Sequence, residues 1–129
     1  MRNYRDLQVL SKAHHLTLEL YRISRQFPRE EIYGITSQLR RAAVSIGANL
    51  AEGCGRRTSP ELARFVRIAM GSASELDYHL VLCRDLGLIS SDDFSTSSTK
   101  LTEVRKMLTS FLQSVEDQIE MQSRAVAEP

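Results

Sequence analysis

Six of the 14 arginines in the sequence fall between residues 40 and 67. They are Arg40, Arg41, Arg56, Arg57, Arg64 and Arg67. A guanidinium group binds a phosphate or a carboxylate through two parallel hydrogen bonds, and several together neutralise the phosphates of a nucleic acid. All of them except Arg41 are therefore candidate contacts to RNA. Ion pairing with acidic side chains, within the chain or between subunits, is the alternative use of the same residues.

The charge of the chain is divided unevenly along its length. Residues 1–70 hold 12 basic and 6 acidic side chains, and residues 71–129 hold 5 and 10. These give net charges of +6 and −5, which sum to the overall +1. The acidic half offers ion-pair partners inside the chain or in another subunit, whereas the basic surplus favours an anionic partner.

The other reactive side chains form no recognisable catalytic or metal site. Glu75 lacks a histidine three positions later, so the ligand spacing of di-metal bundles is absent. His14 and His15 are adjacent and point about 100° apart on a helix, so they cannot share a metal. Cys54 and Cys83 lack CxxC spacing and are expected to be small buried residues. We therefore predict a non-enzymatic protein with no cofactor, metal or small-molecule substrate.

Four segments carry the apolar spacing of amphipathic helices. The first begins near Asp6, whose side chain can cap it, and ends before Pro28, because proline disfavours a helical conformation in the residue before it. The second follows a connector over residues 28–34, with a cap on Thr36 or Ser37. Gly53 and Gly55 are expected to end it, since glycine adopts the left-handed cap conformation at little cost. The apolar positions of these two segments are Val9, Ala13, Leu16, Leu20, Ile23, Phe27, Ile35, Leu39, Ala42, Ala43, Ile46 and Leu50.

The third segment starts either with Ser59 as cap and Pro60 behind it, or with a capping box between Thr58 and Glu61. It runs to about Leu86, is terminated by Gly87, and is about 40 Å long. A cap on Ser90 or Ser91 opens the fourth segment. The apolar positions of the two are Leu62, Phe65, Ala69, Ala73, Leu76, Leu80, Cys83, Leu101, Val104, Leu108, Phe111, Leu112, Val115 and Ile119.

Long amphipathic helices joined by short connections pack with their neighbours in opposite directions. We predict an all-α protein, an antiparallel up-and-down four-helix bundle over residues 1–122 with a frayed C-terminal tail over residues 123–129. No run approaches the roughly 18 apolar residues of a membrane span, and the first residues lack an apolar signal core. We expect a cytoplasmic protein without a membrane partner.

The second helix has more apolar surface than one bundle needs. Besides its core stripe, it carries a polar stripe and a third face of small apolar residues that permits close approach of another helix. We expect a subunit interface there, although alanine on a solvated helix face is the alternative. The candidate interface residues are Arg41, Val44, Ser45, Ala48, Asn49, Ala51 and Glu52. Asn49 and Glu52 are expected to be at least partly buried.

The run SQLRRAAVSI at residues 37–46, followed by NLAEG at residues 49–53, resembles the signature of the proteins encoded in intervening sequences of bacterial 23S ribosomal RNA genes. The resemblance implies an antiparallel four-helix subunit in a ring-like homopentamer, with a poorly defined role. The accessory protein of diversity-generating retroelements is similar, and binds nucleic acid and a reverse transcriptase through a basic pentameric barrel. The resemblance therefore implies an oligomeric scaffold or adaptor that contacts structured RNA or an RNA-bound protein. The alternative is a protein-only assembly module whose arginines pair subunits.

Overall fold

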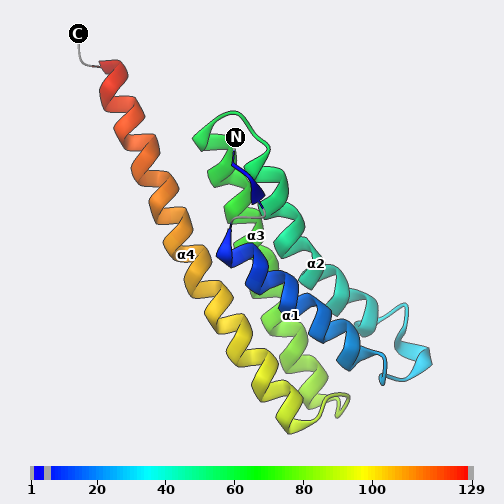
Figure 1. Ribbon diagram of the computed structural model, residues 1–129. Coiled ribbons are helices and arrows are strands. Elements are labelled where there is room, and N and C mark those ends of the chain that lie inside the picture. The colour runs from blue at the N-terminus through cyan, green and yellow to red at the C-terminus, as the bar shows by residue number, and fades with distance from the viewer. Residues whose placement is uncertain (1, 5–6, 128–129) are drawn as a thin grey trace.

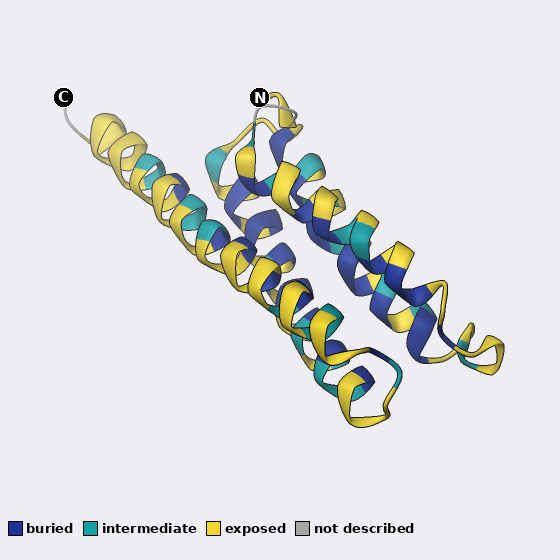
Figure 2. Ribbon diagram, turned by 60° about the horizontal axis from the view of Figure 1, so that its bottom comes forward, coloured by how far each residue is buried: buried dark blue, intermediate teal, exposed yellow. Residues whose placement is uncertain are grey.

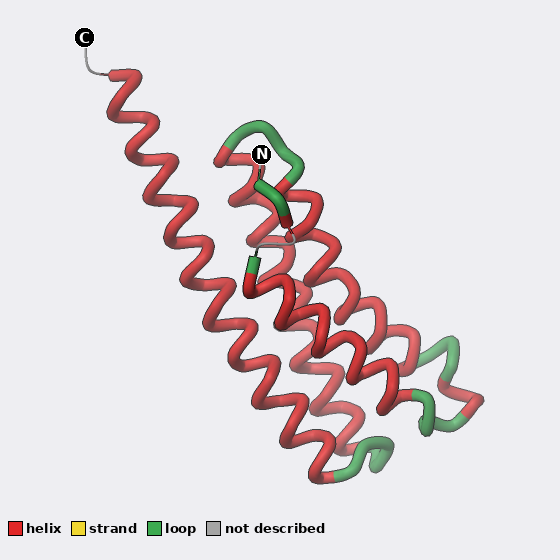
Figure 3. Tube along the Cα trace, viewed as in Figure 1, coloured by secondary structure: helices red, strands yellow, loops and turns green. Residues whose placement is uncertain are grey.

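The computed structural model describes residues 2–4 and 7–127, and its ribbon is dominated by four long helices (Figure 1). They are α1 (Gln8–Ser24), α2 (Ile35–Cys54), α3 (Ser59–Asp85) and α4 (Ser91–Ala127), with a short 3₁₀ helix, η2 (Arg29–Glu31), between the first two. Within the described ranges there is no strand (Figure 3). The predicted all-helical class with four helices is confirmed.

The four helices surround one core. α2 packs against α1 and α3, and α4 packs against α3 and α1. The α1–α2 and α3–α4 connections lie at one end of the bundle, and the α2–α3 connection lies at the other end beside the N-terminus (Figure 1). Buried residues line the inward side of each helix (Figure 2). The α2–α3 connection therefore places Arg56 and Arg57 at one end of the molecule.

The predicted apolar stripes form this core. Every stripe residue of the first three segments is buried, which confirms the 3.6-residue period on which they were based. In α4, Leu101, Val104, Leu108 and Val115 are buried, whereas the remaining stripe residues are half-buried. α4 has 37 residues and α1 only 17, so α1 cannot cover the whole of α4.

The predicted N-cap of α2 is wrong, whereas at its C-terminus Gly55 is the cap, as predicted, without the left-handed conformation expected of it. Its N-cap is Gly34, without a side-chain hydrogen bond, and Thr36 is buried with its hydroxyl unpaired among the described residues. At the other end, the C-cap Gly55 has a φ of −82°, which is right-handed. Gly53 lies inside the helix, where an added Cβ would come within 2.8 Å of the Cβ of Phe65 on α3. Its missing side chain therefore allows α2 and α3 to pack closely.

Both ends of α3 agree with the predictions made from the sequence. Of the two predicted starts, the one with Thr58 occurs: the Glu61 N–H donates to Thr58 Oγ1 at 3.3 Å. Gly87 ends the helix with a φ of +73°, and the Leu88 N–H donates to the Cys83 carbonyl at 2.9 Å. This six-to-one hydrogen bond across a left-handed glycine is the Schellman arrangement.

The remaining helix ends differ in part from the predictions. α1 ends at Ser24, so Phe27 packs into the core from the connector, and the predicted cap Asp6 lies outside the described residues. Ser90 caps α4, because its Oγ accepts from the Asp93 N–H at 3.1 Å. α4 continues to Ala127, past the predicted end of the bundle at residue 122, and residues 120–127 are all exposed.

Candidate nucleic-acid and subunit interfaces

The α2–α3 turn brings three of the predicted RNA contacts to one corner of the bundle. Arg56 and Arg57 follow α2, and Arg64 lies in the second turn of α3. Phe65 is buried beside two of them, with Cζ of Arg56 and Cζ of Arg64 at 4.8 Å and 5.2 Å from its ring centroid. Such cation–π contacts are attractive and hold the two guanidinium groups beside the ring. Arg56, Arg57 and Arg64 are called the arginine corner below.

The members of the arginine corner differ in how far they are already engaged. Arg56 Nη2 donates to Glu52 Oε1 at 2.8 Å, in a pair that is largely exposed. Arg57 is exposed and forms no ion pair or hydrogen bond with the described part of the chain. Exposed ion pairs are worth only about 0–1 kcal/mol, so an incoming phosphate can compete with Glu52 for Arg56.

Arg2 also reaches this corner, although nothing in its sequence position signalled it. Its backbone N–H donates to the Cys54 carbonyl at 3.0 Å, and it lines a small cavity of about 60 Å³ together with Arg56 and Arg57. The Arg2 guanidinium lies over the Phe111 ring, 5.5 Å from its centroid. The basic character of the corner therefore extends toward α4.

The other two predicted RNA contacts lie elsewhere. Arg40 Nε donates to Ser24 Oγ at 2.8 Å, and its guanidinium covers the Tyr21 ring at 4.6 Å, so it fastens α2 to α1. Arg67 Nη2 donates to Glu116 Oε2 at 3.1 Å and links α3 to α4. The prediction grouped these arginines because they are close along the chain. In the bundle, the rotation of each helix about its axis places them against different neighbours.

Both cysteines are buried, as predicted. Burial raises the pKa of the Cys54 thiol, and the nearby Arg2 guanidinium lowers it by a smaller amount. Burial raises the pKa of Cys83 to about 11, and the Glu31 carboxylate adds to the rise. Neither thiol is activated as a nucleophile, because nucleophilic attack requires the thiolate.

One residue of the polar stripe of α2 (Gln38, Arg41, Ser45, Asn49 and Glu52), Ser45, contacts α3. Ser45 Oγ lies 2.8 Å from Ser72 Oγ, and Asn49 Nδ2 donates to the Ser45 carbonyl and hydroxyl at 2.8 Å and 2.9 Å. Asn49 is half-buried, as expected. Glu52 is exposed and paired with Arg56, so the expectation that it is at least partly buried is wrong for the single chain. Ser72, a buried partner on another helix, was not identified from the sequence.

The small-residue face of α2 is open in the single chain. Val44 and Ala48 are exposed and Ala51 is half-buried. On α3, Ile68 is 40% exposed and Tyr78 62% exposed. Arg41 is exposed too. α2 and α3 thus carry apolar side chains that the described part of the chain leaves in contact with water.

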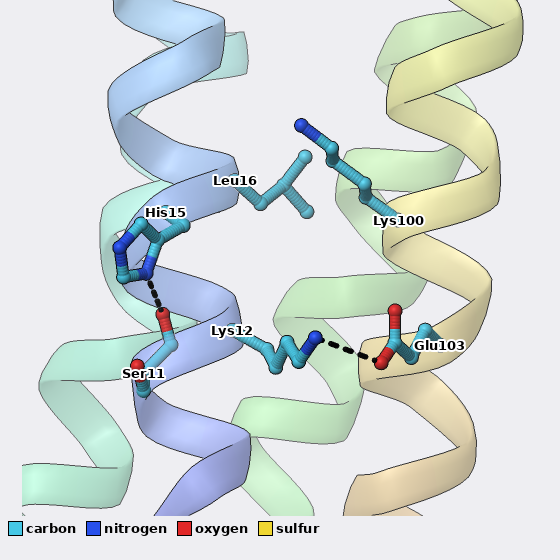
Figure 4. A pocket seen from close by; sticks show the side chains of 6 residues that line it. All are labelled: Ser11, Lys12, His15, Leu16, Lys100 and Glu103. Carbon is cyan, nitrogen blue, oxygen red and sulfur yellow. Dashed lines mark hydrogen bonds and ion pairs between the residues drawn. The ribbon is translucent and has the colours of Figure 1, made fainter.

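A second cavity, of about 340 Å³, lies in the seam between α1 and α4 (Figure 4). Lys12 Nζ pairs with Glu103 at 3.2 Å across it, and Lys100 pairs with Glu19. The two lysines and two glutamates balance in charge, so a charged ligand would have to displace one of these pairs. The cavity is lined by Ser11, Lys12, His15, Leu16, Lys100 and Glu103.

Over the described ranges, no three His, Cys, Asp or Glu side chains lie together as metal ligands would. None of the helices there combines the length and the apolar composition that crossing a bilayer requires.

Residues 5–110 match the family model of the 23S rRNA-intervening sequence protein. The chain belongs to this family. Among solved structures it is similar to a protein of unknown function from the S23 ribosomal protein family of Bacteroides thetaiotaomicron VPI-5482. That likeness has a TM-score of 0.76 at 23% identity, over 81% of this chain and 95% of the other, and it establishes the fold alone. No match was found among curated proteins. The family suggested by the SQLRRAAVSI run is confirmed.

Proposed function

We propose that the chain is a non-enzymatic scaffold subunit, an antiparallel up-and-down bundle that assembles into a ring-like homo-oligomer, a pentamer, and contacts structured RNA. The observation that carries the RNA contact is the arginine corner, where Arg56, Arg57 and Arg64 meet and Arg57 has no partner in the described chain. A ring repeats this corner once per subunit, so weak phosphate contacts combine into avidity.

The open apolar face of α2 supports self-association. Val44 and Ala48 are exposed side by side on the helix surface, one turn apart, and small side chains let another backbone approach closely. The RNA contact is expected to be largely independent of base sequence, because the Phe65 ring at the corner is buried and unable to stack on a base.

A mobility-shift assay with a structured RNA, repeated from low to physiological salt, tests the RNA contact. We expect affinity to fall steeply with salt, through counterion release. The double variant Arg56→Glu/Arg57→Glu should bind more weakly, with a shallower salt dependence. Arg25→Glu/Arg29→Glu is the matched control, because it makes the same charge change at the opposite end of the bundle.

Two results would contradict this function. Absence of binding at low salt removes the RNA contact altogether. Equal loss of binding in both double variants means that net charge, and not the arginine corner, attracts the RNA.

The alternative is a protein-only assembly module in which these arginines pair with carboxylates of another subunit, as Arg56 and Arg67 pair with carboxylates of their own chain. Light scattering on the Arg56→Glu/Arg57→Glu variant separates the two functions. An intact oligomer that has lost RNA affinity supports the RNA scaffold. A dissociated variant shows that these arginines hold subunits together.

A further inference from the structure

The C-terminal part of α4 projects beyond the rest of the subunit (Figures 1 and 3). With 37 residues, α4 spans about 55 Å, compared with about 40 Å for the 27 residues of α3. The match to the family model stops at residue 110, so this projecting part lies outside the matched region. Residues 116–127 are called the extension below.

The apolar stripe of α4 does not stop where the bundle stops. From Val115, which is fully buried, the stripe continues to the half-buried Ile119 and, with Gln122 between them, to Val126, which is 87% exposed. These positions are three or four residues apart and share one side of the helix. A helix end with an apolar side that its own subunit leaves in water is suited to packing on another surface.

The same chain has a cavity, called the notch below, between the start of α1 and α4, and residues 2–4 and 7–127 leave it open to solvent. It has a volume of about 380 Å³, within the range of ligand-sized pockets, about 300–1,000 Å³. Its lining residues are Leu7, Gln8, Val9, Lys106, Met107, Ser110 and Phe111. Lys106 is the one charged residue of this lining, and it makes no ion pair with the described residues.

The charge of the extension favours contact with the notch over contact with a second extension. The extension has a net charge of −2, from Glu116, Asp117 and Glu120 against the single base Arg124. Glu116 pairs with Arg67 and Glu120 pairs with Arg124, and both pairs are exposed. Two extensions side by side would repel each other, whereas the notch presents Lys106 and no acidic lining residue. The notch is therefore the complementary partner in both polarity and charge.

We propose that the extension of one copy docks into the notch of a second copy, with its apolar side in the cavity and its acidic residues beside Lys106. This inference rests on the self-association proposed above and names a surface for it. Because the two surfaces differ, the contact is heterologous, and a heterologous contact forms a ring when its rotation closes.

Cysteine cross-linking between copies tests the contact directly. Met107→Cys and Val126→Cys are made in separate copies, which are mixed and oxidised. The two positions are about 28 Å apart along one helix, so a disulfide between them must join two chains. We expect a disulfide-linked heterodimer from this mixture. Tyr33→Cys, which replaces a 95% exposed residue, is the control partner for Val126→Cys and should give none.

Light scattering on a chain that ends at Ile119 completes the test. The described residues that this truncation removes, 120–127, are all exposed, so the bundle should keep its melting temperature while the oligomer loses mass. Lys106→Glu should weaken association, and adding Glu120→Lys should restore it. If the truncated chain keeps the oligomer mass and the cysteine pair forms no cross-link, this inference is overturned while the proposed self-association stands. A full-length chain of monomeric mass overturns both.

Discussion

Replacing Gly53 by alanine tests how closely α2 and α3 pack beneath the arginine corner. The new Cβ would lie 2.8 Å from the Cβ of Phe65 and 3.0 Å from Cδ1 of Leu62, whereas carbon atoms in contact prefer about 3.5–4.0 Å. Overpacking of this kind costs about 1–3 kcal/mol, and the better helix propensity of alanine returns about 1 kcal/mol. We expect Gly53→Ala to lower the free energy of unfolding by up to about 2 kcal/mol.

Gly47, on the same helix, provides the matched control. An added Cβ there has no neighbour within 4 Å, so Gly47→Ala should stabilise the protein by about 0.5–1 kcal/mol. Because the propensity gain is common to both variants, the difference between them, about 1–3 kcal/mol, isolates the overpacking at Gly53. Displacement of Phe65 should also weaken RNA binding, since Arg56 and Arg64 lie against its ring.

Urea unfolding of both variants at one protein concentration measures this difference. The midpoint should fall for Gly53→Ala and rise for Gly47→Ala, with the slope unchanged. Equal midpoints, or a higher midpoint for Gly53→Ala, would refute the close packing of α2 on α3.

Four further changes test other parts of the structure. Thr58→Ala removes the cap of α3 and should cost about 1 kcal/mol in urea unfolding. Glu52→Gln breaks only an exposed pair, so the free energy of unfolding should change by less than about 1 kcal/mol. Because the native pKa of Cys83 is raised from 9.0 to about 11, its contribution to stability is complete below pH 9 and lost as the pH rises to 11. Cys83→Ala should remove that part of the alkaline decline. Ala48→Arg should dissociate the oligomer, as measured by light scattering.

Helix number and core followed from the sequence because both depend on local periodicity. Leu16, Leu39 and Leu76 are buried at positions that a 3.6-residue spacing identifies without knowledge of their neighbours. Periodicity did not predict the role of Gly53. Its position suggested a helix terminus, but it lies inside α2 and allows close packing against Phe65 on α3, a contact that sequence spacing does not reveal.

The candidate site could be predicted only where its members are close in the chain. Arg56 and Arg57 share a corner with Arg64 because a short turn joins α2 to α3. Arg40 and Arg67 instead contact residues distant in sequence, and these contacts depend on how each helix is rotated in the bundle. Contacts between helices decide which arginines remain available for an external partner, and spacing along one sequence does not predict those contacts.

The mass of the full-length protein in solution tests the scaffold account most directly. Multi-angle light scattering at micromolar concentration should give a whole-number multiple of the 14.6 kDa chain, five-fold for the ring that the family resemblance implies. A mass of 14.6 kDa that does not change with concentration would contradict the account, because the open face of α2 and the extension of α4 would then have no second copy to cover them.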